Sequence, residues 1–227
     1  MKYRDFSFGH WMRRKITRSF TGGIESVRTT RKIVALTFDD GPDPEYTPRV
    51  LDILERHDAK GTFFMIGNRV EQCRHIVRRT AEAGHSIGVH SWDHSNFSAI
   101  DSKERQDQIL SCEMVLSPFC QKLFRPPFGH LTIKSGIDCR RLGYKVILWS
   151  SVIYDWQIHD AAWTARRLFK GLTPGGIILM HDHLWKHRNP EETHPVLSAL
   201  DYVLGRSKDF SFVTIPRLLS EAEGELR

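Results

Sequence analysis

The sequence predicts one α/β domain, a distorted (β/α)7 barrel-like fold with parallel strands inside and helices outside. Seven short apolar runs alternate with segments of helical periodicity, which is typical of a parallel sheet covered by helices. The longest irregular segments follow strands and are rich in ionisable or aromatic residues, as expected at the carboxyl ends of parallel strands. The chain has 227 residues, 40% of them hydrophobic and 26% charged, which suits an ordinary globular domain with one core.

The expected elements follow one another without a repeat or a long linker. Short apolar runs predict strands over 33–38, 61–66, 86–89, 122–124, 144–149, 176–180 and 210–214. Helical periodicity predicts helices from Thr47 onward and over 70–81, 102–116, 132–142, 161–171 and 196–204. Thr47 is expected to cap the first helix, because Pro48 suits its first turn.

The formal net charge of +6 limits the classes of partner. Part of this charge lies near the start of the chain, where it could serve an acidic surface or polymer, although a solvated basic face is the commoner explanation. No nucleic acid is expected, because the chain lacks an aromatic-basic platform and a helix-turn-helix pattern. The four cysteines lack the spacing of a zinc site and predict buried thiols in a reducing compartment. The oligomeric state does not follow from the sequence.

Residues 1–20 are basic and aromatic. They lack the continuous apolar core and the small-residue cleavage site of a secretory signal. No run in the chain approaches the roughly 18 apolar residues of a membrane span. The expected location is therefore cytoplasmic. Residues 1–20 either lie on a membrane surface as an amphipathic segment, which would give a peripheral membrane contact, or pack against the domain.

Two adjacent carboxylates, Asp39 and Asp40, end the first predicted strand just before Gly41. Neighbouring carboxylates at the end of an apolar strand repel each other and lose solvation. A bound cation, a nearby arginine or protonation of one carboxylate relieves that cost. The strand ends that follow offer a metal site and an arginine.

Two histidines, His90 and His94, follow the third predicted strand. On a helix or a tight loop, a spacing of four places both imidazoles on one side, and the aspartate pair can add a carboxylate. Taken alone, this spacing is more often structural or coincidental. Together with the aspartate pair it predicts a two-histidine, one-carboxylate metal site with open positions for water and substrate.

Two further strand ends carry candidate residues. Arg125 follows the fourth strand, where its guanidinium can pair with whichever aspartate does not bind the metal. A surface arginine beside a proline turn is the alternative. His181 ends the sixth strand and suits a general acid, although it could also be a structural histidine.

Five short motifs stand at strand ends in the order Thr37-Phe38-Asp39-Asp40-Gly41, His90-Ser91-x-x-His94, Arg125-x-Pro127-Phe128, Asp155-Trp156 and Leu179-x-His181. They resemble the motifs of the polysaccharide deacetylases of carbohydrate esterase family 4, which include the nodulation chitooligosaccharide deacetylases. The resemblance covers about residues 32–219. It suggests a basic arm or helix over 1–31, a catalytic domain over 32–219 and a polar tail over 220–227.

The resemblance implies a metal-dependent N-deacetylase, a hydrolase of carbon–nitrogen bonds other than peptide bonds. Its substrate would be an N-acetylated sugar, such as N-acetylglucosamine, in an oligosaccharide, polysaccharide or glycoconjugate. The cofactor would be a divalent metal, zinc first and otherwise cobalt, nickel or manganese. The implied metal ligands are Asp40, His90 and His94.

The resemblance also implies the remaining roles. The implied catalytic residues are Asp39 as base, His181 as acid, and Arg125. The implied substrate-binding residues are Phe128, Asp155, Trp156 and Leu179. Among these, the Trp156 and Leu179 side chains would form an apolar slot for the acetyl methyl group.

One position departs from the family pattern. The family usually carries an aspartate three residues before the Asp-Trp pair, where it raises the pKa of the catalytic histidine, and here that position is Val152. The pKa of His181 is therefore expected to leave it more readily neutral at pH 7, unless Asp155, Asp182 or His183 compensates. The same substitution motivates an alternative function, a catalytically weak or inactive glycan-binding relative that retains the metal site.

Overall fold

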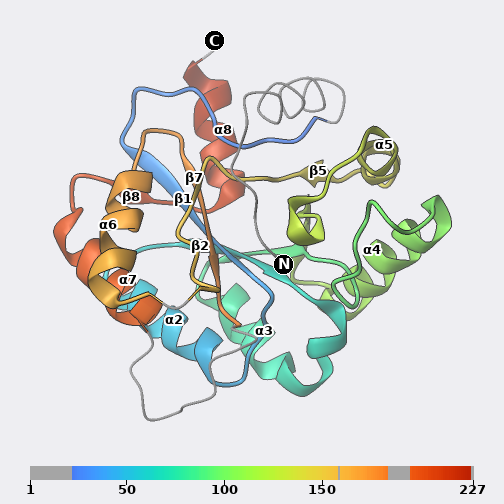
Figure 1. The fold of residues 1–227 in the computed structure, drawn as a ribbon, viewed down its shortest axis with the longest axis horizontal. Helices are drawn as coiled ribbons and strands as arrows, with labels where there is room; N and C mark the ends of the chain where they lie inside the picture. Colours follow the sequence, from blue (N-terminus) through green and yellow to red (C-terminus); the bar gives the residue numbers. More distant parts are fainter. Residues whose placement is uncertain (1–21, 158, 184–194, 226–227) are drawn as a thin grey trace.

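A curled parallel sheet forms the centre of the computed structural model and makes a half-barrel, with helices along its outer side (Figure 1). The structure describes residues 22–157, 159–183 and 195–225. The strands are β1 (Ile33–Asp39), β2 (Gly61–Met65), β3 (Ser86–Val89), β4 (Cys120–Phe124), β5 (Lys145–Val146), β6 (Ser151–Val152), β7 (Ile177–His181) and β8 (Ser211–Phe212).

The α-helices are α2 (Tyr46–Arg56), α3 (Arg74–Glu82), α4 (Ser102–Leu116), α5 (Ile133–Arg141), α6 (Ala161–Gly171), α7 (Pro195–Arg206) and α8 (Ile215–Glu225). Three short 3-10 helices are η1 (Gly67–Arg69), η2 (Glu71–Cys73) and η3 (Pro127–Gly129). The helix predicted over 70–81 therefore begins with a 3-10 turn and becomes α-helical at Arg74.

The strand order confirms the predicted (β/α)7 barrel-like fold. The order is β5-β4-β3-β2-β1-β7-β6, and β8 pairs with the start of β1. Every pairing between these strands is parallel. Their carboxyl ends therefore meet at one rim, where the motif residues were expected to converge.

β6 and α8 lie where the sequence predicts an irregular segment and a tail. β6 is only two residues long, which is too short to produce a periodic pattern. α8 continues past residue 219, where the catalytic domain was expected to end. Its Ile215 and Leu218 side chains are fully buried in the apolar cluster inside the half-barrel, so tertiary packing holds this helix on the domain.

α2 begins one residue before Thr47, the predicted cap. The Asp43 carboxylate accepts hydrogen bonds from the N–H groups of Glu45 and Tyr46, at 2.8 and 2.7 Å. The hydroxyl of Thr47 accepts from the N–H of Asp43 and donates to the Asp182 carboxylate. The prediction that Thr47 caps the helix is wrong, because Asp43 supplies the acceptor oxygen and Thr47 is bonded elsewhere.

Part of the predicted N-terminal arm is attached to the sheet. Ile24 forms a parallel bridge with Ile147, and Ser26 forms an antiparallel bridge with Gly176. The proposed membrane contact of residues 1–20 lies outside the described residues. Within the described part of the chain, no helix has the length and apolar character needed to cross a membrane.

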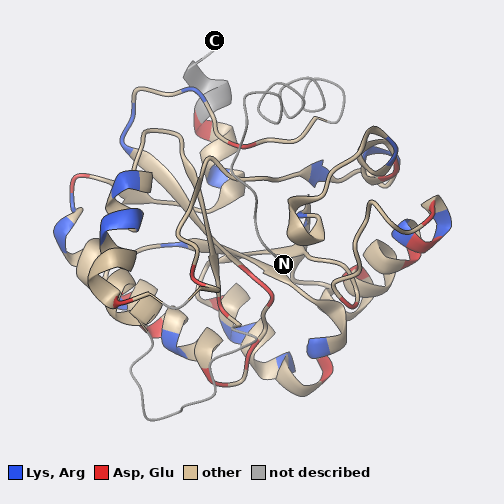
Figure 2. Cartoon of the chain, viewed as in Figure 1, with Lys and Arg blue, Asp and Glu red and all other residues tan. Residues whose placement is uncertain are grey.

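Lysine and arginine residues are spread over several helices around the sheet rather than gathered on one element (Figure 2). Exposed examples are Lys103 on α4, Lys134 on α5 and Lys170 on α6. In the described part of the chain, this distribution favours a solvated basic surface as the explanation for the positive charge.

The side chains of β1 alternate between two apolar layers. Leu36 and Phe38 belong to the large cluster under the helices, whereas Ile33 and Ala35 belong to the cluster inside the half-barrel. Because side chains two residues apart share one face of a strand, Asp39 continues the inner column. The strand therefore carries a carboxylate from the apolar interior to the rim.

α4 begins with a capping box. The Asp101 carboxylate accepts a hydrogen bond from the N–H of Glu104 at 2.9 Å, and the Glu104 carboxylate accepts one from the N–H of Asp101 at 3.0 Å. Two backbone donors at the start of this long helix are satisfied in this way.

The substitution Asp101→Ala should lower the free energy of unfolding by about 1 kcal/mol, because it removes the acceptor of this cap. Urea denaturation followed by circular dichroism measures the change. Asp107→Ala, at an exposed position in the middle of the same helix, is the matched control and should cost less than half as much. An equal loss in the two variants would contradict a capping contribution.

Candidate metal and catalytic site

The two adjacent aspartates reach the same rim because the backbone changes direction between them. Asp39 is the last residue of β1, and Asp40 has a φ of 74°, which breaks the alternation of the strand. The Nε2 atom of His90 lies 3.3 Å from Asp40 Oδ1 and 3.9 Å from Asp39 Oδ2. Both carboxylates therefore face the histidine loop that follows β3.

Asp40, His90 and His94 each bring one potential ligand atom to a common point, and these atoms lie within 4.8 Å of one another. Asp40 Oδ1 is 3.3 Å from His90 Nε2 and 3.2 Å from His94 Nε2. These separations match those of ligands that each lie about 2.1 Å from one ion. One carboxylate and two imidazoles suit zinc and several other divalent metals, so the residues fit the predicted cofactor.

Electrostatics favour an ionised Asp40. Burial alone would raise its pKa. The contacts with His90 and His94 and the charge of His181 outweigh burial and hold the pKa of Asp40 well below its usual range. The carboxylate is therefore ready to bind a cation.

A hydrogen bond on the side of the ring away from Asp40 fixes the orientation of His90. Its Nδ1 lies 2.8 Å from the carbonyl oxygen of Arg125, to which the ring can only donate, so Nε2 faces Asp40. The N–H of His94 donates to the hydroxyl of Ser91 at 2.9 Å. Backbone contacts thus determine which ring nitrogen of His90 is offered to the metal.

Arg125 is fully buried and pairs with Asp39. Its Nη1 donates to Asp39 Oδ1 at 2.7 Å and to the hydroxyl of Thr37 at 2.8 Å. Its other nitrogens donate to the carbonyls of Ile147 and Leu148. The alternative of a surface arginine is wrong, and the predicted pairing with the aspartate outside the metal cluster is confirmed.

Asp155 holds His181 by two hydrogen bonds. One carboxylate oxygen accepts from the His181 N–H at 2.7 Å, and the other lies 2.7 Å from its Nδ1. Burial alone would lower the pKa of His181, but the charge and hydrogen bond of Asp155 outweigh it and raise the pKa to about 10. Of the three residues named as possible compensators for Val152, Asp155 is the one that contacts His181, and Asp40 and Asp39 add to the negative charge around the ring.

The other two residues considered as compensators have different partners. The Asp182 carboxylate accepts a hydrogen bond from Thr47 at 2.5 Å. His183 Nδ1 lies 2.6 Å from the Asp43 carboxylate. Asp155, which the sequence analysis places among the substrate-binding residues, therefore lies behind the predicted acid, with a fully buried carboxylate.

The predicted substrate-binding side chains lie around these charged groups. The Trp156 ring meets the His181 ring edge-on, with centroids 5.4 Å apart. The Phe128 ring meets the His94 ring edge-on at 4.5 Å, and Phe128 is 53% exposed. Leu179 is buried on β7. One aromatic ring thus stands beside the predicted acid and another beside a predicted ligand.

A family model described as polysaccharide deacetylase matches residues 26–147. The chain belongs to this family. The peptidoglycan-N-acetylglucosamine deacetylase PgdA of Listeria monocytogenes is 36% identical over 198 residues, which are 85% of this chain and 40% of the relative. The chain therefore spans less than half the length of that relative. The resemblance inferred from the five motifs is confirmed.

Solved structures share the fold. The crystal structure of the Bc1960 peptidoglycan N-acetylglucosamine deacetylase has a TM-score of 0.80 and 32% identity, covering 87% of this chain and 92% of that one. BA3943 of Bacillus anthracis, described as a pseudoenzyme of the CE4 family, has a TM-score of 0.77 and 27% identity, covering 87% and 68%. The same fold therefore occurs in a deacetylase and in a pseudoenzyme.

Thr37 belongs to the first motif and is absent from the predicted site residues. Its hydroxyl donates to the carbonyl of Ile178 at 2.7 Å and accepts from Arg125. It thereby connects β1, β7 and the buried guanidinium. Thr37 lies two residues before Asp39, on the same face of the strand, and this spacing is the signal from which its contact with Arg125 could have been predicted.

The geometry predicts different consequences for the two adjacent aspartates. Asp40→Asn should weaken zinc binding strongly, because it removes the only carboxylate of the predicted ligand set. Asp39→Asn should leave zinc bound while abolishing turnover, because Asp39 pairs with Arg125 outside that set. Titration calorimetry and metal analysis of the purified variants measure the difference. Equal metal loss in both variants would show that the two roles are not divided.

The contact between Asp155 and His181 predicts a change in the pH profile. Because the pKa of His181 is raised, its proton is present at neutral pH and is lost as pH rises through that pKa. Asp155→Asn should move the alkaline limb of kcat/KM to lower pH by at least about one unit. Asp209→Asn, which removes an exposed partner of Lys32, is the control and should leave the limb in place. An unmoved limb in Asp155→Asn would refute the assignment.

Proposed function

We propose that this chain is a metal-dependent N-deacetylase that hydrolyses the acetamide group of an N-acetylated sugar in a glycan. The observation that carries the proposal is the position of Asp39. It lies between a buried arginine on one side and the Asp40–His90–His94 set on the other. A carboxylate in that position can take a proton from a water molecule that attacks the substrate.

A divalent metal held by Asp40, His90 and His94 would supply a Lewis acid for the acetamide carbonyl and the attacking water. Arg125 directs one carboxylate oxygen of Asp39 away from the rim, because its Nη1 donates to Asp39 Oδ1. The other oxygen, Oδ2, is the one that faces His90. This oxygen would accept the proton.

His181 would return a proton to the departing amine. Its Nδ1 is engaged by Asp155, so Nε2 remains to face the substrate. β1 and β7 pair so that Asp39 stands directly opposite His181. The proton acceptor and the proton donor therefore flank one position, in which the carbon–nitrogen bond of the acetamide would lie.

Two relatives and two apolar side chains at the rim support the proposed substrate class. Both PgdA and Bc1960 are peptidoglycan N-acetylglucosamine deacetylases, so an N-acetylglucosamine-containing glycan is the proposed substrate. Trp156 and Leu179 would enclose the acetyl methyl group in an apolar slot. The cytoplasmic location stays a prediction.

The alternative of an inactive glycan-binding protein began with Val152. The contact of Asp155 with His181 removes the reason for expecting a weak acid at this site. BA3943, a pseudoenzyme, has the same fold, so the fold alone does not establish that a member of this family is active. The alternative therefore needs an experimental test.

Acetate release from N-acetylglucosamine oligomers should be detected with zinc or cobalt and lost on treatment with a chelator. Mass spectrometry of the oligomers should show the matching loss of acetyl groups. Asp39→Asn serves as the inactive control. Metal binding without acetate release from chitin or peptidoglycan oligomers would favour the glycan-binding alternative.

A further inference from the structure

The loop between His90 and His94 contains backbone conformations that are unfavourable without support from other parts of the fold. Ser91 and His94 have φ angles of 70° and 67°, in the left-handed region that ordinary residues rarely adopt. Such positions persist only where surrounding contacts determine them. Contacts outside the loop therefore have to fix the positions of the two imidazoles.

The first set of contacts comes from η1. The N–H of Gly67 donates to the carbonyl of Ser91 at 3.0 Å, and the N–H of Asn68 donates to the carbonyl of Trp92 at 2.9 Å. A side chain at Gly67 would come within 2.6 Å of the Trp92 ring and 3.0 Å of the backbone of Cys112. The close approach of η1 to the loop therefore requires glycine at this position.

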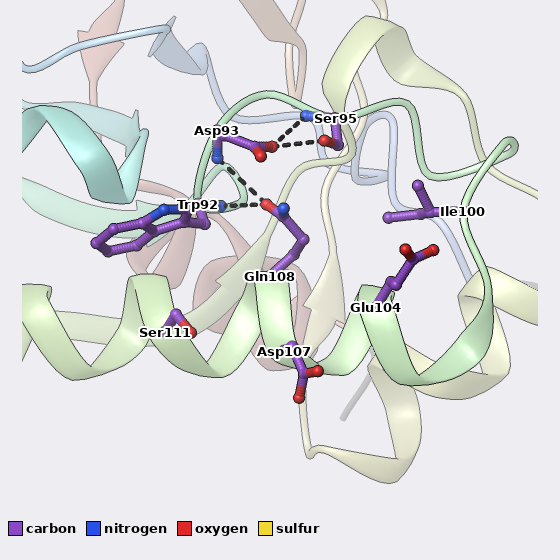
Figure 3. Close-up of a pocket in the computed structure, with 8 residues that line it drawn as sticks. All are labelled: Trp92, Asp93, Ser95, Ile100, Glu104, Asp107, Gln108 and Ser111. Carbon is purple, nitrogen blue, oxygen red and sulfur yellow. Dashed lines mark hydrogen bonds between the residues drawn. The ribbon is translucent and has the colours of Figure 1, made fainter.

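The second set of contacts comes from α4, through one side chain. The Oε1 atom of Gln108 accepts hydrogen bonds from the N–H groups of Trp92 and Asp93, at 2.8 and 3.2 Å (Figure 3). Carbonyl groups of the loop thus bind η1, and N–H groups of the loop bind α4. Consecutive peptide units between the two histidines are held from both elements.

We propose that Gln108 is a positioning residue for the metal site. It holds the loop between His90 and His94 through the N–H groups of Trp92 and Asp93, and its hydrogen bonds do not include the predicted ligands. The ring of His90 donates to the carbonyl oxygen of Arg125, and the N–H of His94 donates to the hydroxyl of Ser91. This inference rests on the proposed metal-dependent function.

The surroundings of Gln108 separate this role from a general contribution to stability. The loop and α4 line a polar groove of about 340 Å³, which also contains the side chains of Ser95, Glu104 and Ser111 (Figure 3). Water can enter such a groove and bond the two N–H groups if Gln108 is replaced. The variant should therefore fold, but a mobile water would not fix the loop as one side-chain oxygen does.

Zinc affinity of the metal-free protein, measured by titration calorimetry, tests the inference. Gln108→Leu keeps the helix propensity and approximate size but removes the acceptor, and it should weaken zinc binding about 10- to 100-fold. Gln108→Glu retains an acceptor oxygen and should stay within about threefold of the wild type. Gln106→Leu, on the same helix, is the matched control and should bind zinc like the wild type.

Thermal unfolding of the metal-free variants provides the second measurement. Gln108→Leu and Gln106→Leu should unfold at similar temperatures, because the proposed loss concerns the site rather than the fold. Wild-type affinity in Gln108→Leu, or equal weakening in the Leu and Glu variants, would overturn the positioning role while leaving the proposed function intact. If Gln108→Leu does not fold, the Gln108→Glu variant tests the inference by itself. Failure of Gln108→Glu to bind zinc would then overturn the positioning role. A wild-type protein that binds no zinc would overturn both proposals.

Discussion

Burial of like charges at the end of β1 is the constraint on which the rest of the structure depends. Asp39 and Asp40 are each only 4% exposed. One fully buried guanidinium, that of Arg125, neutralises Asp39, and breaking such a pair from one side costs several kcal/mol, on the order of 3–5. Asp40 instead faces two imidazoles. The neighbouring strands therefore have to place one guanidinium and two imidazoles beside the two carboxylates.

Left-handed backbone conformations accompany the convergence of these groups. Asp40, Ser91, His94, Phe128 and Tyr154 all have φ angles between 56° and 74°. Each belongs to a motif segment or lies beside one, at the end of a strand. Local strain of this kind is concentrated at functional sites, where the chemistry requires particular side-chain positions and the surrounding fold stabilises the strained backbone. Here the support includes the buried arginine and the contacts of α4 and η1 with the histidine loop.

Local patterns predict every described strand except β6, most helices and the charged residues of the site, because strand alternation and strand-end positions follow from sequence spacing alone. They do not predict which distant groups will pair. Asp155 is predicted as a substrate-binding residue and as one of three possible compensators for Val152, because the sequence does not show which carboxylate lies beside the His181 ring, 26 positions away. Gln108 lies 16 residues from Trp92 on a helix whose pattern explains it as a surface position. β6 is too short for any periodicity.

The pairing of β1 with β7 has a consequence for how this architecture can diversify. Asp39 and His181 are register partners in adjacent parallel strands, so the hydrogen-bonded ladder sets their separation. The loops beyond the strands do not set this separation. Loop sequences and lengths can therefore change, and with them the fit of the proposed substrate, while the spacing of these two groups stays constant. The sheet thus sets the spacing of the proposed base and acid, whereas the predicted substrate contacts of Phe128 and Trp156 come from segments that follow strands.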